Sequence, residues 1–289
     1  MKKTYLLAGV SVLLWSTLAT VSKLMLGTMS SEQLLCVSSL FAVAVLLLFC
    51  LFTGRLKKFK ELSFKDIVII ILIGLPGTFL YNEFLFLGTA RMQASQAFII
   101  NYLWPIMSVV FACILLKEKL SRRKGIAIVM SFLGVITVAG GNLLDFDAGA
   151  LIGAGFCVLA AVSYGAFTAL NKKWHYDKWI SMMLSFAVAF FLSLIICLTR
   201  GTDWTMNAGE WLGSAWNGIF VLAIATVTWA LALDGGNTAK ISNLAYITPF
   251  LSLVWTALVL GEMPSVWSVG GLCLIVAGIF IQLIPNKNK

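Results

Sequence analysis

The chain has 289 residues, of which 60% are hydrophobic and only 11% charged, and its mean hydropathy is +0.97. A soluble domain of this size carries roughly a quarter charged residues, because its surface must meet water. The composition therefore excludes an ordinary soluble protein and indicates that lipid surrounds most of the chain. The net charge of +9 is then explained by basic residues that flank membrane helices, and not by nucleic-acid binding.

Apolar runs are long enough to cross a hydrocarbon core of about 30 Å when they contain about 20 helical residues. Ten runs of the chain reach this length or come close to it, and the fifth is short. We therefore predict an all-α integral membrane protein with ten transmembrane helices. The runs are residues 5–26, 33–53, 67–90, 94–116, 125–140, 149–170, 179–198, 214–234, 241–260 and 266–284.

Basic residues are distributed unequally between alternate connections. If the N-terminus is cytoplasmic, 18 of the 21 Lys and Arg residues lie in cytoplasmic segments and only Arg91 and Arg200 lie in outer loops. Cytoplasmic loops of membrane proteins carry such an excess. The sequence thus predicts a multi-pass protein of the cytoplasmic membrane with both termini in the cytoplasm.

The two halves of the sequence repeat each other. A shift of 144 residues brings Tyr102 onto Tyr246, Pro105 onto Pro249 and Glu118 onto Glu262. This predicts a first five-helix repeat over 1–140, a second over 149–284, and a cytoplasmic tail over 285–289. Because five is odd, the second repeat enters the membrane from the opposite side, so the repeats have inverted topology, as in many transporters.

Several motifs carry a resemblance to a known family. The five-plus-five helices, the acidic residue that ends the fourth and ninth helices, and the mid-helix prolines resemble the EamA family of the drug/metabolite transporter superfamily. Within it, the segments 14–17, 100–105 and 236–249 are similar to YddG-type exporters of aromatic amino acids. In that branch a tryptophan of the sixth helix helps to line the cavity, whereas this chain has Ser163 and Tyr164 at the matching place.

Pro105 and Pro249 lie near the middle of the fourth and ninth runs, where each removes a backbone N–H. They are either ordinary kinks or a matched pair of bends that flank a central cavity and gate it. Polar residues recur on one helical face beside each proline, either to line this cavity or to bond neighbouring helices together. These faces hold Asn101, Trp104 and Ser108 in the first half, and Ala245, Thr248 and Ser252, with Tyr246, in the second.

Lys23 and Glu83 are charged residues inside membrane runs. Counted at 1.5 Å per residue, they lie roughly 27 Å and 24 Å along their helices, at a similar depth in the outer half of the bilayer. Because isolated charge is costly there, we expect the two to pair and to shape an outer vestibule or recognise substrate charge. The alternative is that Lys23 extends to the outer headgroups while protonated Glu83 bonds to Asn82.

Aromatic residues also occur deep in the predicted helices, where their flat apolar faces and polar edges suit a small amphipathic solute. Each could equally be a packing residue. Together with the residues that the motifs and the resemblance indicate, the expected cavity set is Trp15, Tyr81, Glu83, Asn101, Tyr102, Trp104, Ser163, Tyr164, Trp229, Tyr246 and Thr248.

The function that these features favour is transport by alternating access, as a secondary active or facilitative exporter of small metabolites. The resemblance implies amino acids, aromatic or neutral, with drugs, organic cations or nucleobases as alternatives. An intramembrane enzyme is disfavoured, since the sequence has no protease, hydrolase, polyprenyl-phosphate or P-loop motif, and a channel predicts a more continuous polar lining. His175 is the only histidine, so we expect no metal site and no cofactor. The expected partners are a small-molecule substrate and the lipid bilayer, without nucleic acid; monomer and weak homodimer both stay open.

Overall fold

The computed structural model describes residues 2–144, 147–174, 176–234 and 243–283, and all regular secondary structure in these ranges is helical. Each of the ten predicted runs contains helix within the described ranges. Eight spans are long and apolar enough to cross a membrane, and two shorter apolar helices cover 248–260 and 266–281. The prediction of an all-α membrane protein is confirmed. The eight spans are 4–25, 31–52, 64–91, 94–115, 122–140, 148–171, 178–199 and 208–229.

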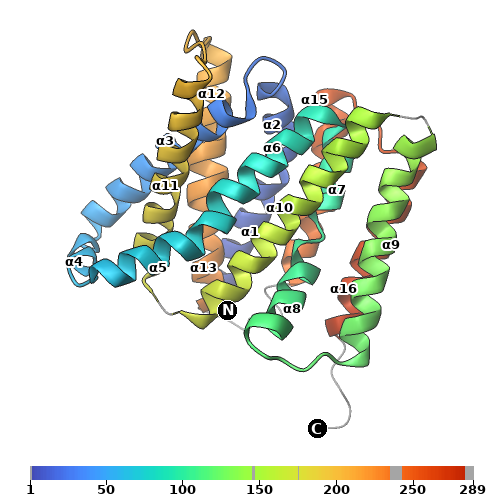
Figure 1. Cartoon of the computed structure of the whole chain (residues 1–289), viewed down its shortest axis with the longest axis horizontal. Helices are drawn as coiled ribbons and strands as arrows, with labels where there is room; N and C mark the ends of the chain where they lie inside the picture. The colour runs from blue at the N-terminus through green and yellow to red at the C-terminus, as the bar shows by residue number, and fades with distance from the viewer. Residues whose placement is uncertain (1, 145–146, 175, 235–242, 284–289) are drawn as a thin grey trace.

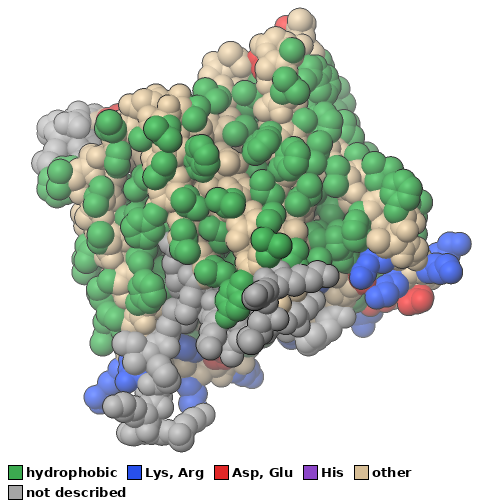
Figure 2. All heavy atoms as spheres, turned by 180° about the vertical axis from the view of Figure 1, so that it is seen from behind, with side chains coloured by type: hydrophobic (Ala, Val, Ile, Leu, Met, Phe, Trp, Pro, Cys, Tyr) green, Lys and Arg blue, Asp and Glu red, His purple; other side chains and the backbone are tan. Residues whose placement is uncertain are grey.

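Hydrophobic side chains cover most of the face that Figure 2 shows. Large apolar side chains such as Leu6, Phe52 and Leu198 are more than half exposed, which in a soluble protein would be an aggregation hazard. Lys and Arg gather along the lower edge of the same view. We call this end of the bundle, where α3 (Ser31–Phe52) ends and α5 (Phe64–Leu75) begins, the basic face, and the other end the opposite face.

The third and eighth spans begin in the same way. Ser63 caps α5 and forms a reciprocal capping box with Asp66, and Asn207 does the same with Glu210 at the start of α12 (Ala208–Ala215). These side chains satisfy amide groups that have no partner within the helix. The two boxes are 144 residues apart, so the repeat extends to the helix ends.

Five of the spans are interrupted within the membrane. The first breaks at Thr17, the third and eighth pass through π-helical segments, and the fourth and ninth change to a new helix just before a proline. The interrupted spans are α1 (Lys2–Ser16) with α2 (Leu18–Met25); α5 with η1 (Pro76–Leu80) and α6 (Tyr81–Arg91); α7 (Ala94–Asn101) with α8 (Trp104–Leu115); α12 with η2 (Trp216–Ala225) and α13 (Thr226–Asp234); and η3 (Asn243–Ile247) with α15 (Thr248–Leu260).

The helices pack in pairs that the repeat relates. The α3 helix packs along α11 (Lys178–Thr199), and α9 (Arg122–Leu144) packs along α16 (Val266–Leu283). Other contacts join the two repeats. The α1 helix of the first repeat contacts α13 and α15 of the second, and the α10 helix (Ala148–Lys173) of the second repeat contacts α6 and α8 of the first (Figure 1). The short helix α4 (Leu56–Phe59) lies in a connection at the basic face.

Glycines permit the closest of these contacts. A Cβ atom at Gly74 would collide with the Ser185 side chain of α11, and one at Gly218 would collide with the Ser38 carbonyl of α3. The two glycines are 144 residues apart and form equivalent contacts in the two repeats. Small residues allow such backbone approach in membrane bundles.

The α3–α11 pair is joined by ion pairs at both ends. Glu32 accepts a bond of 2.6 Å from Arg200 at the opposite face, and Asp177 accepts bonds of 2.8 Å from Arg55 and 2.9 Å from Lys58 at the basic face. Glu32 and Asp177 are 145 residues apart, as are Arg55 and Arg200. We call these two sets of contacts the clamps.

Candidate functional site

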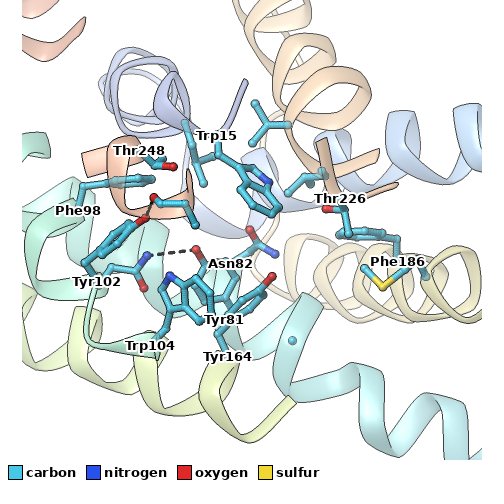
Figure 3. A pocket seen from close by; sticks show the side chains of 17 residues that line it. Trp15, Tyr81, Asn82, Phe98, Tyr102, Trp104, Tyr164, Phe186, Thr226 and Thr248 are labelled. Carbon is cyan, nitrogen blue, oxygen red and sulfur yellow. Dashed lines mark hydrogen bonds between the residues drawn. The ribbon is translucent and has the colours of Figure 1, made fainter. Parts of the chain in front are cut away.

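A cavity lies at the centre of the bundle, where the interrupted helices of both repeats meet (Figure 3). Its volume is about 70 Å³, enough for several water molecules. Its lining comprises Trp15, Leu18, Gly77, Tyr81, Asn82, Phe98, Asn101, Tyr102, Trp104, Tyr164, Met182, Phe186, Val221, Leu222, Thr226, Ala245 and Thr248.

Aromatic rings form much of the wall. The Tyr164 ring of α10 lies 4.6 Å from the Tyr81 ring and 5.1 Å from the Trp104 ring, centroid to centroid, the second pair being edge to face. Trp15, which also lines the cavity, packs against Trp229, which does not, with their ring centroids 5.2 Å apart. These rings come from both repeats, so the site exists only where the repeats meet.

Three polar side chains place atoms without hydrogen-bond partners in this wall. The amide nitrogen of Asn101 donates to the Tyr81 hydroxyl at 3.1 Å (Figure 3), and that of Asn82 donates to the Thr78 carbonyl at 2.6 Å. The carbonyl oxygens of both amides and the Thr248 hydroxyl are buried without a partner. Because buried polar atoms are normally bonded, these three are positions for a ligand or for water.

The two prolines begin new helices, and each leaves the carbonyl group one turn earlier without its usual N–H donor. Both lie at the second residue of a new helix, Pro105 in α8 and Pro249 in α15, so the chain breaks before them instead of bending within a continuous helix. Without its N–H, Pro249 cannot donate to the Ala245 carbonyl one turn earlier. The Tyr102 hydroxyl of the first repeat donates to that carbonyl instead.

The predicted pair of Lys23 and Glu83 is wrong. The Lys23 ammonium group donates to the carbonyls of Thr89 and Met92, at 2.9 and 2.6 Å, and so caps the end of α6. Glu83 instead accepts a bond of 2.9 Å from Ser31 at the start of α3. Carbonyl groups without partners at the C-terminal end of a helix attract a cation. Counting residues along each helix gives the depth of Lys23 but does not reveal this helix end beside it.

The alternative for these two residues also differs from the structure. The Asn82 amide nitrogen bonds to Thr78 and not to Glu83, and Glu83 does not line the cavity. The Ser31 hydroxyl oxygen also lies 2.9 Å from a carboxylate oxygen of Glu32. Glu83 therefore belongs to a polar cluster near the clamp of the opposite face.

Of the other predicted residues, seven line the cavity, namely Trp15, Tyr81, Asn101, Tyr102, Trp104, Tyr164 and Thr248. Ser163 is buried but does not line it, and Trp229 lies behind Trp15. The side chain of Tyr246, His175 and the tail 285–289 fall outside the described residues.

Several lining residues were missed, the most polar being Asn82. Gly74, Thr78 and Asn82 recur every four residues and thus share one face of the third span, which is the signal that could have revealed it. Phe98, Met182, Phe186 and Thr226 carry no comparable pattern.

Two repeats of membrane helices that meet at a central cavity are typical of membrane transporters, and the comparisons with known proteins place the chain in this class. The sequence pattern of the EamA-like transporter family matches residues 2–140 and 151–284. The chain therefore belongs to this family, as its motifs predicted.

Relatives match this chain along most of their length. An uncharacterized transporter of Clostridium kluyveri is 26% identical over 100% of this chain and 95% of its own. The aromatic amino acid exporter YddG of Ancylobacter novellus is 23% identical over 74% of this chain and 76% of its own. A solved crystal structure superposes with a TM-score of 0.67 at 22% identity, covering 98% of this chain and 96% of that chain, and shows the same fold.

Proposed function

We propose that this chain exports amino acids, neutral or aromatic ones in particular, across the cytoplasmic membrane by alternating access around the central cavity. The observation that carries the proposal is the cavity itself, which combines rings of Trp15, Tyr81, Trp104 and Tyr164 with unpartnered amide and hydroxyl oxygens. Flat apolar surface with a few convergent polar atoms suits a small amphipathic solute.

Two further observations support the proposal. A relative that is 23% identical over 74% of this chain is named an aromatic amino acid exporter. The excess of Lys and Arg on the basic face, seen along the lower edge of Figure 2, supports cytoplasmic termini. The site offers binding groups, and transport without a chemical step on the solute is the simplest use of it.

Flux in proteoliposomes tests the proposal. Vesicles that contain the purified chain are loaded with tryptophan, phenylalanine, leucine or glutamate, and efflux is measured with and without a pH gradient. We expect saturable efflux of the neutral or aromatic amino acids. Trp104→Ala should reduce this efflux at least tenfold, because it removes the ring that meets Tyr164 edge to face.

Trp267→Ala is the matched control, since Trp267 lies on α16, is 47% exposed and does not line the cavity. Equal loss of flux in both variants, or no flux of any amino acid, would overturn the proposal. Flux of organic cations or nucleobases in place of amino acids would establish the alternative substrates.

A further inference from the structure

The Asn82 side chain presents a fixed acceptor to the cavity. Its amide nitrogen lies 2.6 Å from the Thr78 carbonyl oxygen, which can only accept a hydrogen bond. The amide therefore cannot be turned round without losing this bond. The oxygen Oδ1 is the free end, and it is buried without a partner in a residue that is 1% exposed.

Two other side chains add to this acceptor set. The Asn101 oxygen and the Thr248 hydroxyl are also buried without partners, in residues that are 2% and 3% exposed. Both residues line the same cavity as Asn82, and the three lie on the third, fourth and ninth spans. The site therefore offers three side-chain oxygen acceptors.

The described residues that line the cavity include no charged side chain. None of the described lining residues is Lys, Arg, His, Asp or Glu. The faces of tryptophan and tyrosine rings attract cations, and carbonyl oxygens accept hydrogen bonds from an ammonium group. A buried carboxylate, in contrast, requires a cation or several donors to offset its desolvation.

We infer that this cavity recognises the ammonium group of its solute through the oxygens of Asn82, Asn101 and Thr248, and that a carboxylate on the solute is dispensable. The inference rests on the proposed function in placing the transported solute in this cavity. It extends the substrate class from amino acids to primary amines that carry an apolar group.

Binding to the purified full-length chain tests the inference without any flux. Calorimetric titration at pH 7 compares tryptophan, tryptamine, which lacks the carboxylate, and indole-3-propionate, which lacks the ammonium group. We expect tryptamine to bind at least as tightly as tryptophan, and indole-3-propionate at least roughly tenfold more weakly, as loss of charge-assisted hydrogen bonds implies. Equal affinity for tryptamine and indole-3-propionate, or no binding of tryptamine, would overturn the inference.

Substitutions of the lining residues test which side chains bind the ammonium group. Asn82→Leu should weaken tryptamine binding at least tenfold and leave the binding of uncharged indole unchanged. Asn217→Leu is the matched control, because Asn217 is also fully buried with an unpartnered oxygen but does not line the cavity. Thr248→Val, which keeps the shape of the side chain, is the second test if Asn82→Leu does not fold.

The two proposals fail separately. Efflux assays with amino acids decide whether the chain exports them, whereas the titrations decide which group of the solute the cavity holds. Tryptamine selectivity that survives in both Asn82→Leu and Thr248→Val would contradict the assigned acceptors even if amino acids are exported.

Discussion

The Tyr102 hydroxyl joins the two repeats through a single carbonyl group. It donates to the Ala245 carbonyl, which Pro249 leaves without its usual donor. A side chain of one repeat thus completes the backbone of the other beside the cavity. Tyr102 was expected as a lining residue, and the structure shows that it also has this second contact.

Removing this hydroxyl should therefore destabilise the protein. Tyr102→Phe leaves a buried carbonyl unsatisfied, which costs about 1–3 kcal/mol, and we expect a lower midpoint of thermal unfolding and reduced flux. In a Pro249→Ala background residue 249 regains an N–H that can reach the Ala245 carbonyl, so the same substitution should cost less. Thermal unfolding of the four proteins in detergent gives the coupling between the two sites.

The same substitution at a distant tyrosine is the control. Tyr5→Phe changes an exposed tyrosine of α1, 42% exposed, and should leave the unfolding midpoint unchanged. An equal effect of Tyr102→Phe in both backgrounds would show that the hydroxyl does not serve the carbonyl that Pro249 frees.

At the scale of the helices, hydrophobic run length predicted the ten spans because the bilayer imposes it. It could not predict how the helices are interrupted. Pro105 and Pro249 marked two of the breaks, but η2 contains no proline and lies where Gly218 packs on Ser38. Such π-helical segments depend on contacts with neighbouring helices.

The same limit applies to the site. Trp104 and Asn101 were predicted because their helical face repeats in the second half of the sequence. The partner of Lys23 could not be predicted, since depth along a helix says nothing about helix tilt or about which helix end lies nearby. The structure shows that the partners of Lys23 are the carbonyls of Thr89 and Met92, at the end of α6.

The clamp at the basic face should make stability depend on pH. Burial raises the pKa of the Asp177 carboxyl, but the hydrogen bonds from Lys58 and the Ile180 amide and the charges of Lys58 and Arg55 outweigh it, so the pKa lies below its ordinary value of 3.8. A carboxyl with a lowered pKa stabilises the fold above the unfolded-state value and loses this effect as the pH falls through the folded-state value.

Asp177→Asn should accordingly lower the unfolding midpoint at pH 7 by roughly 2–4 °C, for a pair worth about 1 kcal/mol. The difference from the unmodified chain should stay constant down to about pH 5 and shrink below about pH 4. Glu61→Gln, at an exposed carboxyl on the same face, should show no difference at pH 7. A difference that persists unchanged at pH 3 would exclude the ion pairs as its cause.

In the whole molecule the two clamps are closed at the same time. Glu32 with Arg200 and Asp177 with Arg55 join α3 to α11 at opposite ends. Both clamps join the same two helices, which also pack along each other between the clamps, so opening either clamp would have to part α3 from α11 at that end. The α3–α11 pair is better suited to serve as a fixed support.

A different contact joins the repeats at the opposite face. Glu262, which follows α15, accepts bonds from the Ser95 amide at 3.2 Å and from its hydroxyl at 3.5 Å, at the start of α7. A carboxylate is favoured at this position, because free amides and the positive end of the helix dipole lie there. In alternating access, opening toward the opposite face has to separate α7 from α15 and break this contact.

Crosslinking distinguishes the gate from the support. In a background without the six native cysteines, Ser95→Cys with Glu262→Cys should stop flux when joined by a short cleavable crosslinker, and cleavage should restore it. Glu32→Cys with Arg200→Cys should retain most flux when crosslinked, as expected if the α3–α11 pair is a fixed support. The uncrosslinked double variants control for the loss of each carboxylate. If the protein keeps full flux when residues 95 and 262 are crosslinked, the repeats do not separate at the opposite face during transport. The protein would then have to release the solute by another motion.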